Sequence, residues 1–368
     1  MDLRPPRDPR SKPETPFGSR RPWLSRALLP VTLGVVLGVF EIGLRVIYPH
    51  GVEKTMESGF PWLVRQPVVG WRNAANYRSP NFSTNEQHLR GPEISLDKPE
   101  GVLRIACLGD SRTFGIWLDR GGLRFDNDYP RLLQKRIDRA DPARRVEVLN
   151  IGVIGYTTVQ AIRQLVTYVP RLDPDILVVN LGVNDHVPSW DPSLQVRTPE
   201  NPLLVALLSA THEWRLVQLG LAAWAGIEEH PPAWSIPWVA PGEYTANLRR
   251  IVELAEQIDT RLLFLHQGLR PLDLGEDIPA VPGEGVNPLR LLGAKDLADL
   301  HRQHGEYRER LGDVARESGV PLIDASELLG RDGRPPGYGP YDQIHTNVEG
   351  ARQVAEAIHR ALLQRDWL

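Results

Sequence analysis

The 368-residue sequence contains a single cysteine, Cys107, and no sustained basic stretch beyond its first 26 positions. One cysteine excludes an intrachain disulfide. Because Cys107 lies within the apolar run LRIAC, we expect its thiol to be buried and unreactive. The net charge of −3 gives no reason to expect a nucleic-acid partner. We find no internal repeat, and the length suits one large domain with appendages.

The N-terminal region combines a basic segment with an apolar one. Residues 1–26 are rich in Pro and Arg, with seven Lys/Arg against three Asp/Glu, which predicts a disordered tail. Residues 27–40 carry no charge, and counting to residue 48 gives 22 residues, near the roughly 20 that span a bilayer. Glu41 and Arg45 are four residues apart and can pair on one helix face. The sequence therefore predicts a single transmembrane anchor at 27–48, with a cytoplasmic N-terminus and the remainder outside the cytoplasm.

Two other interpretations of this apolar segment stay open. It could be the core of a cleaved signal peptide, although no small-x-small cleavage pattern follows it. It could also be a buried helix of a soluble protein. Gly34 and Gly38 form a GxxxG pattern that can pair such helices, but this pattern is common by chance, so the oligomeric state is left open.

From residue 102 onward, apolar strands alternate with amphipathic helices. The predicted strands are 103–107, 146–150, 176–181, 261–266 and 321–324, and the predicted helices are 129–140, 158–169, 243–258, 305–319 and 348–363. This order predicts an α/β fold with a parallel sheet, in which functional sites lie at the carboxyl ends of the strands.

The remaining segments do not follow this alternation. Residues 49–101 are interpreted as a linker and N-terminal extension. Two insertions follow strand ends, at about 186–242 and 269–300, and the first holds five of the ten tryptophans. Each could form a lid over the site or a surface loop with a small core of its own.

Four polar corners come at the strand ends. The first strand ends in Gly-Asp-Ser with Ser111, and the second in NIGVIGYTT with Gly155. The third ends in GVND, which contains Asn184, and the last is followed by DQIH, which contains Asp342 and His345. Because parallel strands bring their carboxyl ends to one edge, we expect these residues to meet there.

These residue types suit acyl transfer. Ser111 is a candidate nucleophile if a base takes its proton, His345 can be that base, and Asp342 can orient the imidazole. The backbone N–H groups of Ser111 and Gly155 and the side-chain amide of Asn184 can form an oxyanion hole. Each motif alone is weak evidence for a catalytic site, and it is their order and their placement at successive strand ends that indicate one.

In that order the four motifs resemble those of the SGNH (GDSL-type) hydrolases, over about residues 102–364. The resemblance implies a flavodoxin-like three-layer α/β/α fold with a five-stranded parallel sheet. It also implies catalytic Ser111, Asp342 and His345, and an oxyanion hole of Ser111, Gly155 and Asn184. The family usually has proline after the histidine, where this chain has Thr346.

Other polar residues receive structural interpretations. Asp110 is expected to bond backbone groups of the serine corner, Asp185 to hold the turn that presents Asn184, and Asp324 to close its strand. His301 and His304 have a spacing that can bind a metal, but no third ligand accompanies them, so we interpret both as solvated helix residues.

The sequence thus predicts a membrane-anchored, extracytoplasmic serine esterase, with no metal and no organic cofactor. Its substrate would be a small acyl ester or an O-acylated glycan. Two alternatives use the same fold. One is an acyltransferase that moves the acyl group to a glycan, and the other is a binding or scaffold protein without turnover.

Overall fold

The structure is a computed structural model, and it describes residues 22–55, 60–187, 201–225, 239–270, 294–327, 329, 337–339 and 342–368. The chain divides into two units, Met1–Pro49 and His50–Leu368. The predicted tail up to residue 21, most of the 269–300 insertion and Trp190, Trp234 and Trp238 lie outside the described residues.

The first unit contains one long helix, α1 (Pro22–Ile47). It begins at Pro22, inside the segment 1–26 that was predicted to be disordered. Its stretch Leu28–Ile47 is long and apolar enough to cross a bilayer. Glu41 and Arg45 form the expected pair, with Nε and Oε1 2.8 Å apart.

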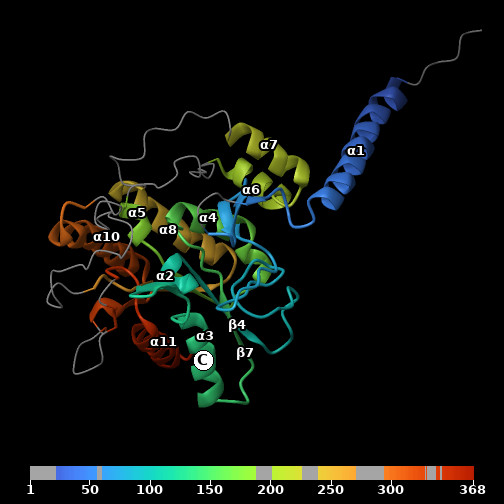
Figure 1. Ribbon diagram of the computed structural model, residues 1–368. Helices are drawn as coiled ribbons and strands as arrows, with labels where there is room; N and C mark the ends of the chain where they lie inside the picture. Colours follow the sequence, from blue (N-terminus) through green and yellow to red (C-terminus); the bar gives the residue numbers. More distant parts are fainter. Residues whose placement is uncertain are drawn as a thin grey trace, which may run out of the picture. The chain divides into compact units, whose positions relative to one another are not determined.

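The second unit is built on a five-stranded parallel sheet of order β10-β9-β8-β4-β7, which confirms the predicted α/β class (Figure 1). Its strands are β4 (Leu103–Gly109), β7 (Val146–Asn150), β8 (Ile176–Asn180), β9 (Arg261–His266) and β10 (Leu322–Asp324). Strand β8 is buried along its whole length, as expected for a parallel sheet covered on both faces.

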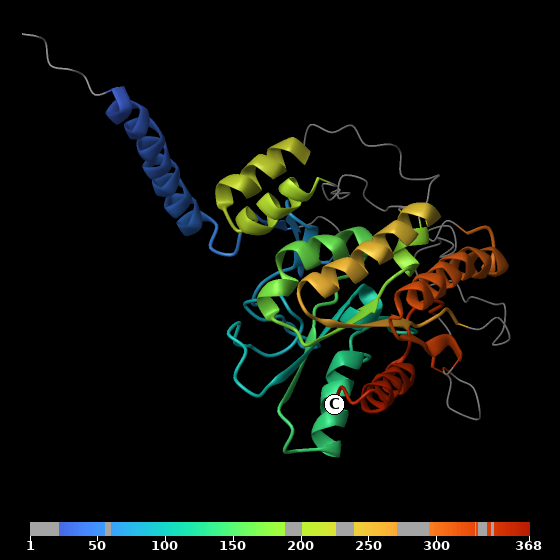
Figure 2. The same cartoon turned by 180° about the vertical axis from the view of Figure 1, so that it is seen from behind.

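Helices cover both faces of this sheet, so the unit has three layers (Figures 1 and 2). One layer contains α3 (Tyr129–Ala140) and α11 (Val348–Leu363), and the other α4 (Thr158–Thr167), α8 (Pro241–Gln257) and α10 (Leu297–Ser318). Side chains along β4 alternate between the two cores: Ile105 and Cys107 pack with the α3/α11 layer, whereas Ala106 and Leu108 face α4 and α8. Cys107 is fully buried, as predicted, and burial raises the pKa of its thiol.

The structure contains elements that the sequence pattern did not predict. The short helices α2 (Ser111–Phe114) and α5 (Val183–His186) directly follow β4 and β8. Helices α6 (Pro202–Thr211) and α7 (Arg215–Ala225) occupy part of the first insertion, and α10 starts inside the second. A hairpin, β5 (Trp117–Asp119) with β6 (Gly122–Arg124), follows α2. The 3-10 turn η1 (Val169–Leu172) follows α4, and η4 (Ala325–Glu327) follows β10.

The segment interpreted as a linker is an integral part of the second unit. It forms a small antiparallel sheet of β1 (Lys54–Thr55), β2 (Leu63–Gln66) and β3 (Gly70–Asn73). Trp71 is fully buried and donates its indole N–H to the Ile154 carbonyl at 2.8 Å. The segment predicted as a linker and N-terminal extension thus contributes aromatic side chains to the core of this unit.

Two glycines let backbone segments approach closely at the end of β4. A Cβ on Gly109 would lie 2.5 Å from the Asn180 carbonyl oxygen. A Cβ on Gly152 would lie 2.3 Å from the Phe114 backbone nitrogen. Neither neighbour is a flexible side-chain end, so glycine is required at both places.

We predict that Gly152→Ala lowers the free energy of unfolding by about 2–3 kcal/mol, because the new methyl group must displace the backbone of α2. Gly305→Ala is the matched control, since its Cβ would meet nothing within 4 Å inside α10. Removing a glycine from a helix interior should raise stability by about 0.5–1 kcal/mol. Chemical denaturation of both variants tests this, and equal midpoints would contradict it.

Asp185 joins α5 to the start of α4. Its Oδ1 accepts hydrogen bonds from the backbone N–H of Thr158 at 3.0 Å and from the Thr158 hydroxyl at 2.6 Å. The carboxyl is therefore bonded to a neighbouring element, whereas we expected it to bond the turn that presents Asn184. Burial raises the pKa of Asp185 to about 7, against the opposing effect of the Thr158 hydrogen bonds.

This pKa predicts a pH-dependent stability. Between about pH 4 and the folded pKa, the unfolded chain releases the Asp185 proton and the folded chain keeps it. The free energy of unfolding therefore falls by about 1.4 kcal/mol for each unit by which the pH rises in this range. The Asp185→Asn variant lacks this contribution. The free energy of unfolding, measured by chemical denaturation, should fall more between pH 5 and pH 8 for the natural chain than for the variant. An equal fall in both proteins would show that the carboxyl does not titrate in this range.

Candidate active site

The serine corner follows directly from the end of the central strand. Strand β4 ends at Gly109, and Asp110 caps the short helix α2 by accepting a hydrogen bond from the Arg112 N–H at 2.8 Å. Asp110 also forms a buried ion pair with the Arg112 guanidinium, 3.3 Å away. These contacts match the role expected for Asp110. Ser111 is thereby held as the first residue of α2, with 6% of its surface exposed.

Ser111, His345 and Asp342 form one chain of hydrogen bonds. The Ser111 Oγ lies 2.8 Å from His345 Nε2, although 234 positions separate the two residues in the sequence. The opposite ring nitrogen, His345 Nδ1, lies 2.9 Å from Asp342 Oδ2 and 3.1 Å from Oδ1. With a carboxylate facing Nδ1, that nitrogen carries the proton and Nε2 is left to accept from the serine hydroxyl.

Asp342 is fixed by backbone donors from two segments. Its Oδ1 accepts from the N–H groups of Ile344 and His345, both at 2.9 Å, and its Oδ2 accepts from the Leu118 N–H of β5 at 2.8 Å. Burial alone would raise the pKa of Asp342, but attraction to His345 and these hydrogen bonds outweigh it and hold the pKa below its usual value. The carboxyl is therefore ionised at neutral pH and can stabilise a charged imidazole.

The oxyanion-hole candidates follow the strands on either side of β4. Gly155 comes after β7 with a φ of +81°, a conformation that favours glycine. Asn184 lies in α5, directly after β8, and its Nδ2 donates to the Tyr156 carbonyl at 3.0 Å. This bond uses one of the two amide hydrogens, and the other has no acceptor among the residues that the structure describes. As the first helical residue, Ser111 has a backbone N–H with no acceptor inside α2.

Asp324 has partners other than His345. Its Oδ2 pairs with Arg308 of α10 at 2.5 Å, and its Oδ1 accepts from the Ser326 N–H at 3.1 Å. It therefore closes the end of β10, as expected.

His304 is not solvated, which corrects the sequence interpretation. It is buried in α10, and its Nδ1 lies 3.0 Å from Nε2 of the buried His186. The ring of His266, at the end of β9, stacks on it at 4.9 Å. Burial lowers the pKa of all three imidazoles, so they are neutral. Within the described parts of the chain, no group of three or more His, Cys, Asp or Glu side chains is arranged to hold a metal ion.

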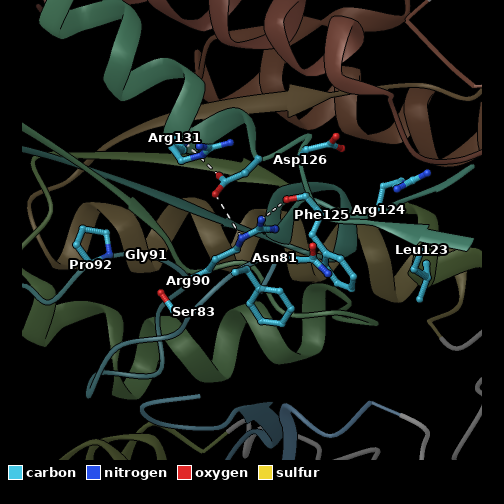
Figure 3. A pocket seen from close by; sticks show the side chains of 12 residues that line it. Asn81, Ser83, Arg90, Gly91, Pro92, Leu123, Arg124, Phe125, Asp126 and Arg131 are labelled. Atoms are coloured by element: carbon cyan, nitrogen blue, oxygen red, sulfur yellow. Dashed lines mark hydrogen bonds and ion pairs between the residues drawn. The ribbon is translucent and has the colours of Figure 1, made fainter. Parts of the chain in front are cut away.

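Arg90 of the N-terminal extension supports the serine corner, and nothing in the sequence pattern indicated it. Its guanidinium donates to the carbonyls of Phe114 and Gly115 at the end of α2 and lies 3.4 Å from Asp128. It also donates to the carbonyl of Phe125 (Figure 3). It also lines a pocket of about 490 Å³ with Asn81, Phe82, Ser83, Gly91, Pro92, Leu123, Arg124, Phe125, Asp126, Asp128 and Arg131. This set includes none of the predicted site residues.

A second support lies at Thr346, where the chain departs from the usual family pattern. The side-chain amide of Asn127 donates to the Thr346 carbonyl at 2.6 Å and to the Ile116 carbonyl at 3.0 Å. It thus ties the residue after His345 to the segment after α2. The histidine loop is fixed through a carbonyl, a contact that proline or threonine can make equally well.

This arrangement contains the parts needed for acyl chemistry at a serine. A hydroxyl is bonded to an imidazole, the imidazole to an ionised carboxylate, and amide donors follow the adjacent strands. A base placed within hydrogen-bond reach of a hydroxyl can take its proton as the oxygen attacks.

The chain is similar to several solved structures. One is Est24, a carbohydrate acetylesterase from Sinorhizobium meliloti, at 14% identity and a TM-score of 0.45, covering 72% of this chain and 99% of that one. Another is LAE5, an α/β hydrolase from the metagenome of Lake Arreo, Spain, at 21% identity and a TM-score of 0.42, covering 70% and 94%.

A comparison with curated protein sequences gives no match. The GDSL-like lipase/acylhydrolase family matches residues 107–353, a range that holds all the residues of the serine, glycine, asparagine and histidine motifs. Because this match spans more than half of the chain, the protein belongs to the GDSL-like lipase/acylhydrolase family and is a carboxylic ester hydrolase.

Proposed function

We propose that this esterase uses Ser111 as its nucleophile, His345 as its general base and Asp342 as the group that orients the base. The observation that carries the proposal is the unbroken chain of hydrogen bonds from the Ser111 Oγ through His345 to Asp342. A cofactor is not needed for any step of this chemistry.

The proposed reaction has two halves. In the first, His345 Nε2 takes the hydroxyl proton as the Ser111 Oγ attacks the ester carbonyl, and the ionised Asp342 stabilises the resulting imidazolium. The oxyanion is bound by the N–H groups of Ser111 and Gly155 and by the free amide hydrogen of Asn184. Collapse expels the alcohol, which receives the proton from His345. In the second half, His345 activates water to hydrolyse the acyl-serine.

The proposed substrate is a small acyl ester or an O-acyl group on a glycan. Ser111 exposes only 6% of its surface, so a substrate must project its acyl group inward to reach the Oγ. This burial favours a compact acyl group on an accessible alcohol.

We also propose that α1 anchors the enzyme in a membrane, with the second unit outside the cytoplasm. The length and composition of Leu28–Ile47 support the anchor. The basic residues that precede the span support the orientation.

The mechanism predicts an order of activity losses. Ser111→Ala and His345→Ala should reduce turnover of p-nitrophenyl acetate to near background, because nucleophile and base act as a unit. Asn184→Ala should reduce it by about 10²- to 10³-fold with little change in KM. Asp342→Ala should lie between these limits, because His345 loses its orienting partner.

A fluorophosphonate probe provides a second readout for the nucleophile. It should label the natural chain and the control Ser209→Ala, whose hydroxyl lies on an exposed position of α6, but not Ser111→Ala. Circular dichroism must show that each variant is folded. Full turnover in folded Ser111→Ala would overturn the mechanism, whereas full turnover in Asn184→Ala alone would remove only the oxyanion assignment.

The anchor makes a separate prediction. The full chain should sediment with membranes, remain there after a high-salt wash, and keep residues 102–368 protected from added protease until the outer side is opened. Immunoblotting of the fractions measures this. Intact chain in the soluble cytoplasmic fraction would contradict the anchor and leave the esterase proposal unaffected.

A further inference from the structure

Helix α6 (Pro202–Thr211) is apolar on its solvent side. It contains no charged residue, and three of its four leucines are open to solvent, with Leu203 79% and Leu207 57% exposed. A helix that is hydrophobic all round is normally buried in a core or a membrane. Contiguous exposed apolar side chains on a soluble domain mark an interaction surface.

The inner face of this helix is already occupied by the protein. Leu208 is buried against Val68 and Val69, which connect β2 and β3, and Val205 is partly buried on the same side. The orientation of α6 is therefore set by the fold.

The opposite face has no covering among the described residues. Leu203, Leu207 and Ala210 recur at spacings of four and three residues, which places them along one stripe of the helix. Leu204 borders this stripe and is half exposed. Trp214, just after the helix, is 48% exposed. We call Leu203, Leu204, Leu207, Ala210 and Trp214 the outer face of α6.

The first residues of the second unit contact α7 (Arg215–Ala225), the helix that follows α6. Val52 donates its N–H to the side-chain oxygen of Gln218 in α7 at 2.8 Å. The amide of Gln218 donates in turn to the carbonyl of His212, which directly follows α6, at 2.8 Å. Val52 comes five residues after Ile47, where the candidate span ends, and five residues reach at most about 18 Å. The stretch of chain between the span and this contact is therefore short.

We propose that the outer face of α6 rests on the surface of the lipid bilayer that α1 crosses. The inference rests on the anchor proposed above. A short tether holds α6 at a high effective concentration near the membrane, so a small apolar surface is enough for contact. Trp214 suits the headgroup region, where indole rings accumulate. Because α6 has no charge, contact should not require anionic lipid and should persist at high salt.

The single buried Cys107 allows a direct test, since an introduced exposed cysteine is the only one that reacts readily. An environment-sensitive fluorophore is attached at Leu207→Cys in the full chain, in nanodiscs of phosphatidylcholine. The matched control is Leu363→Cys, a leucine on α11 that is 49% exposed. Val36→Cys, within α1, reports on the anchor itself. Each labelled chain must keep the circular dichroism spectrum and thermal midpoint of the natural one.

We expect a nitroxide on the lipid acyl chain, near the headgroup, to lower the fluorescence of the label at Leu207→Cys by at least about twofold and to leave that at Leu363→Cys unchanged. Iodide in the aqueous phase should quench the label at Leu363→Cys more strongly than the label at Leu207→Cys. Quenching at Val36→Cys but not at Leu207→Cys would overturn the inference and leave the anchor intact. Absence of quenching at both would remove the anchor as well. A blue-shifted label at Leu207→Cys that acyl-chain nitroxide does not quench would assign the face to a second protein chain and overturn the inference.

Discussion

The position of the serine depends on contact between backbone segments at two glycines. Gly109 ends the central strand against the carbonyl of Asn180 on β8, and Gly152 lies against the backbone nitrogen of Phe114 at the end of α2. A methyl group at either place would have to move main-chain atoms that belong to the sheet or to the serine helix. The segment that carries Ser111 is thus held by main-chain packing against the ends of two neighbouring strands. The hydrogen bonds of the site depend on this backbone packing, because they can form only when the Ser111 hydroxyl lies within reach of His345.

Three polar side chains hold the backbone segment that follows the serine. Arg90, Asn127 and Asn150 all donate to backbone carbonyls between residues 113 and 116, the segment that leaves the serine helix. Irregular buried backbone has no ladder of its own, so each carbonyl needs such a donor. The three donors come from the N-terminal extension, the segment before α3 and the end of β7. Part of the support for the proposed nucleophile is therefore contributed by Arg90, which precedes the matched family range and lies in the segment predicted as a linker and N-terminal extension.

The sequence predicted those features that depend on local pattern and chain order. Apolar runs located all five strands of the sheet, and the polar residues after them came together because parallel strands share a carboxyl edge. Features that arise from contacts between distant segments could not be predicted. Arg90 looks like an ordinary surface charge in a loop, and the burial of His304 depends on His186 and His266, which come from other elements. Helix α2 is only four residues long, too short for a period to be visible, and α6 reads as part of a loop-rich insertion because its apolar residues show no clear polar face.

A continuous set of contacts connects the point where the chain enters the second unit with the proposed oxyanion donor. Arg72 donates to the His50 carbonyl at 2.6 Å, and its neighbour Trp71 accepts at its own carbonyl from the Tyr156 hydroxyl at 2.7 Å. The carbonyl of Tyr156 then accepts from the amide of Asn184 at 3.0 Å, which sets the rotation of that amide and the direction of its second hydrogen. A side-chain donor stabilises an oxyanion well only if it is preorganised, since reorienting it during the reaction would cost part of the gain. Asn184 obtains this order from Tyr156, whose hydroxyl is bonded to Trp71 of the N-terminal extension. Residues from His50 onward, where the second unit begins, therefore contribute to the geometry of the proposed site.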